Sequence, residues 1–198
     1  MATLKDVIYS VDAIKPNAFT EEDKTIWLNE VEGMVQTEVF LFAPAEIVQY
    51  KWSDEIAVPS VYFPDDKTMV CGVDPGLAAG GQIKISGLTT YSANNSNTNR
   101  RVLKRSSDGL TYAFEDNSFS ATGDTEDSCT LIYDGSETEL LVIFPHDKLY
   151  RSYLAAMIDW ANGEYNKYAN TMTMFNEHWG EYMRWFARTY RPADRHRW

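Results

Sequence analysis

The sequence is short of the side chains on which most catalytic and metal sites depend. Its 198 residues include two cysteines and three histidines, and no apolar run approaches a membrane span. An isolated pair of cysteines makes no disulfide framework in a chain of this size, so we expect Cys71 and Cys129 to be reduced thiols in the core. Residues 1–12 lack the basic start and apolar stretch of a signal peptide. This predicts a protein that is made and kept in the cytosol.

Recognisable catalytic and cofactor-binding motifs are also missing. Segment 76–83 has the glycine spacing of a phosphate-binding loop, but Gln82 and Ile83 stand where such a loop needs Lys and Ser or Thr. We therefore expect a turn there. The histidines lie far apart and belong to no metal-binding repeat, and no serine or cysteine has the local pattern of an activated nucleophile. The sequence predicts a protein that is not an enzyme and holds no cofactor or metal.

Positive charge is scarce and unevenly placed. The formal net charge is -11, so most of the surface should repel nucleic acid. The exception is the C-terminal end, where Asp194 is the only acid in residues 183–198 and arginines gather at Arg184, Arg188, Arg191, Arg195 and Arg197. A basic end on an acidic body favours docking on an acidic protein surface, with Trp198 as an anchor, over binding to nucleic-acid phosphate. A merely solvated end is the alternative.

Helical periodicity marks the beginning of the chain. Apolar residues recur at helical spacing through residues 4–14 behind a capping Thr3, and Pro16 ends this run. A second helix begins at Thr20, with acids in its first turn, and should run to about Phe42.

The last fifty residues predict a helical hairpin. Its first arm opens at Asp147, and Gly163 marks the turn into the second arm. The second arm carries large apolar side chains at alternating steps of three and four residues, a set that we call the seam: Tyr165, Tyr168, Met172, Phe175, Trp179, Tyr182 and Phe186. A heptad-like seam needs a partner surface. Because the chain has more aromatic surface than one hairpin can use, we expect part of it to face another subunit or protein.

Short apolar runs separated by Gly, Asp, Asn and Pro fill the middle of the chain. They lie at 58–63, 69–73, 82–86, 101–105, 111–114, 128–133 and 140–143. Such runs predict a small antiparallel β unit. The expected fold class is α+β, a helical bundle with an inserted small antiparallel β domain. The expected parts are an N-terminal helical pair (1–49), the inserted β domain (50–145), a C-terminal helical hairpin (146–190) and a basic tail (191–198).

Both helical ends of the sequence resemble small structural proteins encoded in the head-to-tail gene block of tailed bacteriophages. The resemblance near the start lies in residues 6–24 and the following Trp27-Leu28. Near the end it lies in Pro145, Asp147-Lys148-Leu149-Tyr150, residues 159–165, Lys167-Tyr168, Met174-Phe175-Asn176 and Arg188-Thr189-Tyr190-Arg191-Pro192. The central stretch, residues 83–119, resembles a β module common in phage neck and connector proteins.

The resemblance implies a head-to-tail adaptor, also called a head completion or connector protein. Such proteins form a ring, usually a dodecamer, under the portal and around the DNA channel. The C-terminal segment in this family typically grips the portal, which assigns portal docking to Arg184, Arg188, Arg191, Arg195, Arg197 and Trp198. The seam would then serve helical packing and the interface between copies. The β insertion of this chain is larger than in the minimal all-helical members.

The partners that the resemblance implies are the portal protein, tail or neck proteins and further copies of the chain. Double-stranded DNA would pass without specific binding, and no membrane is involved. The expected location is the neck of the virion, with the host cytoplasm during assembly.

Two alternatives stay open on the sequence. A tail-completion or tail-terminator protein would bind the tail tube instead of the portal. A binding module would use the β unit to recognise a glycan or a host surface, with Trp52, Tyr62 and Tyr91 as its aromatic platform.

Overall fold

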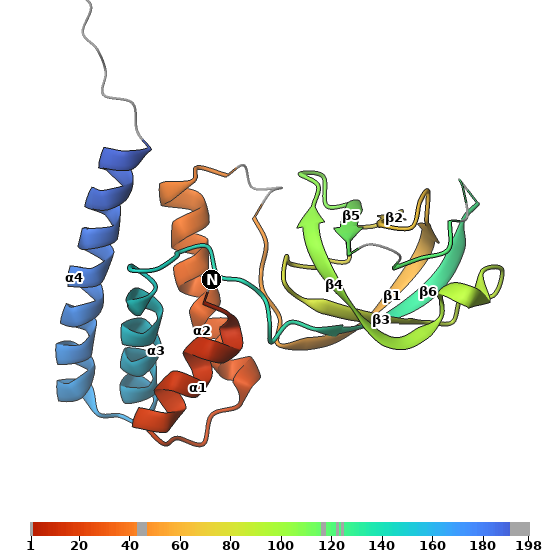
Figure 1. Ribbon diagram of the computed structural model, residues 1–198. Helices are drawn as coiled ribbons and strands as arrows, with labels where there is room; N and C mark the ends of the chain where they lie inside the picture. Colours follow the sequence, from red (N-terminus) through yellow and green to blue (C-terminus); the bar gives the residue numbers. More distant parts are fainter. Residues whose placement is uncertain (1, 43–46, 116–117, 122, 124, 191–198) are drawn as a thin grey trace, which may run out of the picture.

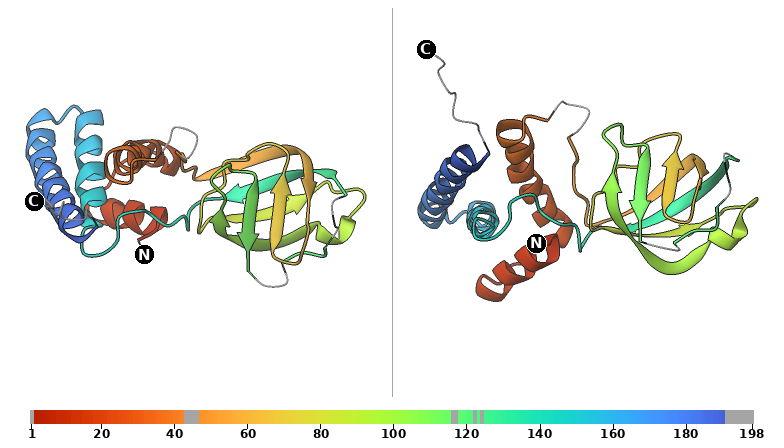
Figure 2. Two further views of the ribbon diagram at one scale, coloured as in Figure 1. Left: turned by 90° about the horizontal axis from the view of Figure 1, so that it is seen from above. Right: turned by 45° about the horizontal axis from the view of Figure 1, so that its top comes forward.

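The computed structural model places a helical unit beside a β-barrel (Figure 1). It describes residues 2–42, 47–115, 118–121, 123 and 125–190. The helical unit contains α1 (Leu4–Ile14), α2 (Glu21–Met34), α3 (Lys148–Ala161) and α4 (Tyr165–Thr189). Both views of Figure 2 show the helices on one side and the barrel on the other, with α4 on the side away from the barrel. The chain thus leaves the helical unit after α2 and returns to it before α3.

The first two helices begin as their sequences predict. Thr3 accepts a hydrogen bond from the Asp6 amide while the Asp6 carboxylate accepts one from the Thr3 amide, and Thr20 and Asp23 repeat this capping box. The second helix differs at its far end. It continues from Met34 into a π-helical turn, η1 (Val35–Val39), and so stops short of the predicted end at about Phe42.

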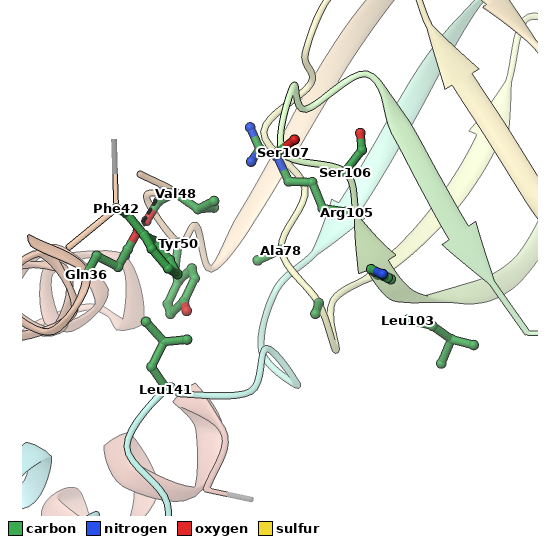
Figure 3. A pocket seen from close by; sticks show the side chains of 12 residues that line it. Gln36, Phe42, Val48, Tyr50, Ala78, Leu103, Arg105, Ser106, Ser107 and Leu141 are labelled. Carbon is green, nitrogen blue, oxygen red and sulfur yellow. Dashed lines mark hydrogen bonds between the residues drawn. The ribbon is translucent and has the colours of Figure 1, made fainter. Parts of the chain in front are cut away.

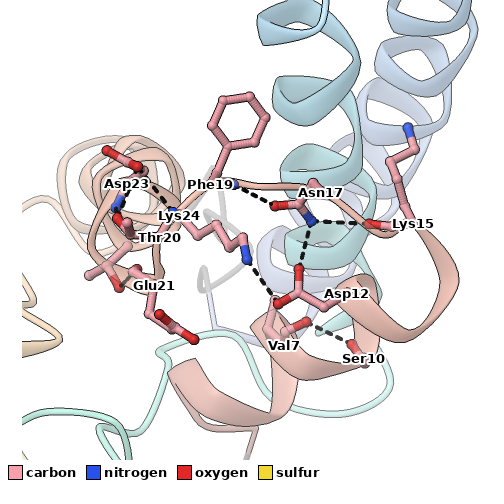
Figure 4. Close-up of polar contacts among 11 residues, drawn as sticks. Val7, Ser10, Asp12, Lys15, Asn17, Phe19, Thr20, Glu21, Asp23 and Lys24 are labelled. Atoms are coloured by element: carbon pink, nitrogen blue, oxygen red, sulfur yellow. Dashed lines mark hydrogen bonds and ion pairs between the residues drawn. The ribbon is translucent and has the colours of Figure 1, made fainter.

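A polar cluster fixes the connection between α1 and α2 (Figure 4). The Lys24 ammonium, almost fully buried, lies 2.8 Å from the Asp12 carboxylate. The Asn17 side-chain amide donates to Asp12 and to the Lys15 carbonyl, while the Asn17 side-chain oxygen accepts from the Phe19 amide. These contacts tie both helices to the loop that Pro16 forces between them, because each buried polar group there has a partner.

The fold class predicted from the sequence, a helical bundle with a small inserted antiparallel β domain, is wrong. The described residues form four α-helices and a closed antiparallel barrel of six strands. In barrel order, β1 (Ser53–Tyr62) is followed by β2 (Thr68–Cys71), β5 (Thr111–Phe114), β4 (Ser96–Arg105), β3 (Gln82–Ser86) and β6 (Asp127–Asp134), which pairs again with β1.

Irregularities in the longer strands explain why the sheet closes. The register shifts between Val58 and Val61 in β1 and between Val102 and Lys104 in β4. Such bulges bend a strand and increase its twist, so one long strand can take part in both halves of a curved sheet. Pro59 lies at the first bulge, where its missing N–H costs no ladder hydrogen bond.

Each unit has its own core. The barrel interior is filled by large side chains such as Phe63, Met69, Tyr112, Phe114 and Tyr133. The seventh predicted strand, 140–143, is not part of the sheet in the described chain. It runs from the barrel to the helices instead, and Leu140 and Val142 are buried in the helical core.

Three polar side chains on α2 and η1 hold both connections between the units. Asn29 exchanges two hydrogen bonds of 2.8 Å with the backbone of Tyr50, and Gln36 exchanges two, of 2.8 and 2.9 Å, with the backbone of Val48. Glu32 accepts a hydrogen bond of 3.2 Å from the Leu141 amide. Positions 29, 32 and 36 share one face of the helix. This face therefore fixes where the chain enters and leaves the barrel.

Candidate functional site

The seam of α4 packs mainly within the chain. Phe175 and Tyr182 are buried in the helical core, whereas Tyr165 at the start of the helix is 66% exposed. The remaining members are half-buried: Tyr168, Met172, Trp179 and Phe186. The neighbouring helix α3 supplies much of the partner surface that the spacing requires, since Tyr153 of α3 packs on Phe175 with ring centres 4.9 Å apart.

An apolar groove opens at the C-terminal end of α4. It encloses a cavity of about 330 Å³, with Tyr182 among its lining residues. We call it the aromatic groove. Besides Tyr182, it is lined by Phe40, Leu141, Ile143, Trp185, Phe186 and Tyr190. Its walls come from the residue after η1, from the segment that leads out of the barrel and from the end of α4.

Ring packing holds the groove open while leaving its edge in solvent. Phe186 packs on Phe40 with ring centres 5.5 Å apart and on Tyr190 at 4.9 Å. Yet Tyr190 is 58% exposed and Ile143 is 41% exposed, and the neighbouring Phe144 is 82% exposed. Contiguous exposed apolar side chains of this size are typical of interaction surfaces in soluble proteins.

Two of the predicted docking arginines lie on the exposed face of α4 and do not line this groove. Arg184 and Arg188 are one turn apart on α4 and both are exposed. Neither forms an ion pair with a carboxylate in the described part of the chain. The other predicted docking residues, Arg191, Arg195, Arg197 and Trp198, lie outside the described residues.

A second cleft lies between the helical unit and the barrel (Figure 3). It has a volume of about 420 Å³, and Tyr50 and Leu141 face Ala78 and Arg105 across it. The Arg105 guanidinium is already paired, since it lies 2.5 Å from the Asp74 carboxylate. The cleft thus combines apolar walls with two basic residues, Lys104 and the paired Arg105.

Glu32 is the one fully buried carboxyl of α2 and lies beside this cleft without lining it. One of its oxygens accepts hydrogen bonds from the Tyr150 hydroxyl and from the Leu141 amide. Burial raises the pKa of Glu32 to about 7, although the hydrogen bond from Tyr150 lowers it. Sequence reasoning missed this residue. The available signal was the position of Glu32, an acid that falls on the apolar face formed by Leu28, Val31 and Val35.

A serine and a histidine also meet, but they form no nucleophilic site. The Ser152 hydroxyl lies 3.1 Å from His178 Nδ1 and 2.9 Å from the Leu149 carbonyl, which competes for its proton. Burial and the nearby Lys148 lower the pKa of His178. Neither side chain lines the aromatic groove or the cleft between the units.

Other sites considered from the sequence have no support in the described residues. Cys71 and Cys129 are free and buried, as predicted, and burial raises the pKa of each thiol to about 12. Within the described residues, no group of three or more His, Cys, Asp or Glu side chains could hold a metal ion. The glycine-rich segment forms a turn at 79–80, with a left-handed φ of 88° at Gly80.

The aromatic residues considered for glycan binding are spread over the molecule. Trp52 is half-buried against the helical core, with its ring centre 6.3 Å from that of Tyr9. Tyr62 lies at the other end of β1, about 30 Å away along an extended strand. Tyr91 lies in the connection between β3 and β4. Trp52 and Tyr62 therefore cannot belong to one platform.

Comparisons with known proteins do not identify this chain. No protein-family model matches the sequence, and no curated protein is significantly similar to it. A search of the described helices finds none that is long and apolar enough to cross a membrane.

Proposed function

We propose that this protein is a structural virion protein, a head-to-tail adaptor that forms a ring between the portal and the tail. The observation that carries the proposal is the aromatic groove at the C-terminal end of α4, the helix whose exposed face carries Arg184 and Arg188. An apolar groove at the end of a helix that also carries exposed arginines suits a protein partner that presents both apolar and acidic side chains. The resemblance of both helical ends to phage neck proteins supplies the identity of that partner.

Portal docking is assigned to the arginine-rich end of the chain: Arg184, Arg188, Arg191, Arg195, Arg197 and Trp198. The acidic body suits the rest of the role. With a net charge of -11, most of the surface repels DNA, so DNA could slide through the ring without being held. The ring would assemble in the host cytoplasm and remain in the neck of the virion.

The proposal is tested by capture on the portal protein of the same phage. The wild-type chain should co-purify with the portal and appear as a ring in negative-stain images. Replacing Arg188, Arg191 and Trp198 together by alanine should abolish capture while the far-ultraviolet circular dichroism stays unchanged. The matched control is R151A, which removes an exposed arginine of α3 and should bind like the wild type. Unchanged capture by the triple variant would remove the C-terminal end from the mechanism.

A tail-completion or tail-terminator protein is the second candidate. The same groove and arginines would then bind an acidic surface of the tail tube. Capture by the tail-tube protein in place of the portal would decide for it. Failure to associate with any neck or tail component would eliminate both candidates.

A further inference from the structure

The aromatic groove and the cleft between the units are neighbouring cavities that share a wall. Leu141 lines both of them. Phe40 lines the groove and Phe42 lines the cleft, and their rings stack with centres 5.7 Å apart. Figure 3 shows Phe42 and Leu141 on the same side of the cleft, opposite Arg105. The two cavities therefore lie side by side, with this apolar wall between them.

The wall and the edges of both cavities stay exposed although they are apolar. Leu41, which lies between the two stacked rings in sequence, is 70% exposed, and Phe42 is 37% exposed. Leu41 also has a left-handed φ of 57°, a conformation that is uncommon for residues other than glycine. At the groove, Ile143 and Tyr190 are 41% and 58% exposed. Exposed apolar side chains along adjoining cavities indicate a surface that a partner covers.

The charge at these cavities is opposite to that of the whole chain. The formal net charge is -11, yet no Asp or Glu of the described residues lines either cavity. Lys104 and Arg105 line the cleft. Arg105 is paired with Asp74, whereas Lys104 forms no ion pair with a carboxylate in the part of the chain that the structure describes. The cleft therefore offers an uncompensated positive charge to a carboxylate of a partner.

A bulge in β4 explains why Lys104 reaches the cleft. The register between β4 and β5 shifts between Val102 and Lys104, and Leu103 is the extra residue. In a regular strand, neighbouring side chains point to opposite faces, but a bulge changes where they point. Leu103 and Lys104 are both exposed, and both line the cleft. The bulge thus places an apolar side chain and a positive charge next to each other at the cleft.

We propose that a single peptide segment of the portal protein occupies both cavities. One of its apolar side chains fills the aromatic groove, a second fills the cleft, and a carboxylate beside the second pairs with Lys104. Such a segment covers the shared wall and compensates the charge at the cleft. The inference rests on the proposed function for the identity of the partner. It adds the cleft and Lys104 to the docking residues at the C-terminal end of the chain.

Photo-crosslinking to the portal protein of the same phage tests whether one segment fills both cavities. A photoreactive phenylalanine analogue replaces Tyr190 at the groove in one version of the full chain and Leu103 at the cleft in another. Mass spectrometry should identify the same portal segment in both products, and that segment should contain Asp or Glu. The analogue at Ile132, which is 50% exposed on β6 and lines neither cavity, should not capture it.

Portal binding by charge variants measures the contribution of each cavity. K104E should weaken binding by about tenfold or more, because a carboxylate of the partner then meets a like charge. I143D should weaken it comparably, because docking would bury a carboxylate in the apolar groove. R151E reverses an exposed charge of α3 that lines neither cavity and should bind like the wild type. Lys104 and Ile143 are exposed in the free chain, so circular dichroism should match the wild type.

The possible results separate this inference from the proposed function. Capture of K104E as strong as that of the wild type would overturn the inference and leave the proposed function standing. Crosslinks from the two cavities to unrelated portal segments, or only to other copies of this chain, would do the same. An equal loss of binding in R151E would show a general effect of charge and would also remove the assigned role of Lys104. If the portal does not capture the wild type at all, the proposed function fails together with the occupant named here.

Discussion

Replacing Glu32 by glutamine tests how the helical unit tolerates a buried carboxyl at its centre. The side chain is fully buried, and burial raises its pKa from 4.5 to about 7. Each pKa unit corresponds to 1.36 kcal/mol, so ionised Glu32 should destabilise the folded chain by about 3 kcal/mol. The glutamine side chain of E32Q would keep an oxygen for the Leu141 amide and could not ionise.

The direction of the pH dependence follows from the two states. Below pH 4.5 the carboxyl is protonated in the folded and unfolded chain, and the penalty is absent. Between pH 4.5 and 7 the unfolded chain loses the proton while the folded chain keeps it, so stability falls. Above pH 7 both states are ionised and the penalty stays constant. The free energy of unfolding of E32Q, compared with that of the wild type, should therefore rise by about 3 kcal/mol from pH 4 to pH 8.

Urea unfolding followed by tryptophan fluorescence measures this difference. The barrel strands contain no tryptophan, so the signal reports on the helical unit and its junction with the barrel. An unpaired side-chain amide in E32Q lowers the free energy of unfolding by the same amount at every pH. It therefore does not change how that free energy varies with pH. E38Q, which changes an exposed carboxyl of η1, should show the same pH dependence of the free energy of unfolding as the wild type. A constant difference between E32Q and the wild type from pH 4 to pH 8 would refute the reasoning.

Three further predictions concern buried groups and the junction. K24M leaves a partly buried carboxylate without its cation and should lower the free energy of unfolding by about 1–3 kcal/mol in urea; R151M, at an exposed site, should not. N29A and Q36A each remove two hydrogen bonds to a connecting segment and should each cost about 1–3 kcal/mol, with faster amide exchange at residues 48–50. Cys71 and Cys129 should react with a thiol reagent at pH 8 only after unfolding, because burial raises both pKa values to about 12; rapid labelling of the native chain would contradict this.

Local features of the helical ends could be predicted from the sequence because local rules decide them. Thr3 and Thr20 cap their helices through residues three positions later, and Pro16 and Gly163 end helices by their own backbone preferences. None of these features depends on a distant part of the chain. The extension of α2 into a π-helical turn does depend on one, since Gln36 there binds the backbone of Val48.

The closed barrel could not be predicted because closure depends on pairing between distant strands. The pairing of β1 with β6 joins Ser53 to Asp134, and no local spacing reveals that partner. Both long strands were also underestimated. β4 begins at Ser96 with polar residues that have no apolar alternation, and the apolar run 140–143 has strand composition although it packs on helices. Apolar periodicity indicates that a segment is buried, but it does not name the surface that buries it.

The same limit applies to the docking surface. The spacing predicts the seam from one helix, but only Phe175 and Tyr182 of its members are buried, and α3 covers much of that face. The aromatic groove instead joins Phe40, Ile143 and Tyr190, which are far apart in sequence and share no period. A side chain such as Phe144, left 82% exposed, forgoes most of the roughly 1.5–3 kcal/mol that full burial would contribute. Its neighbours are held in place by packed rings, so the exposed edge has little freedom to collapse inward. Only a second surface can recover that free energy, which makes the groove, and not the seam, the place where association should be sought.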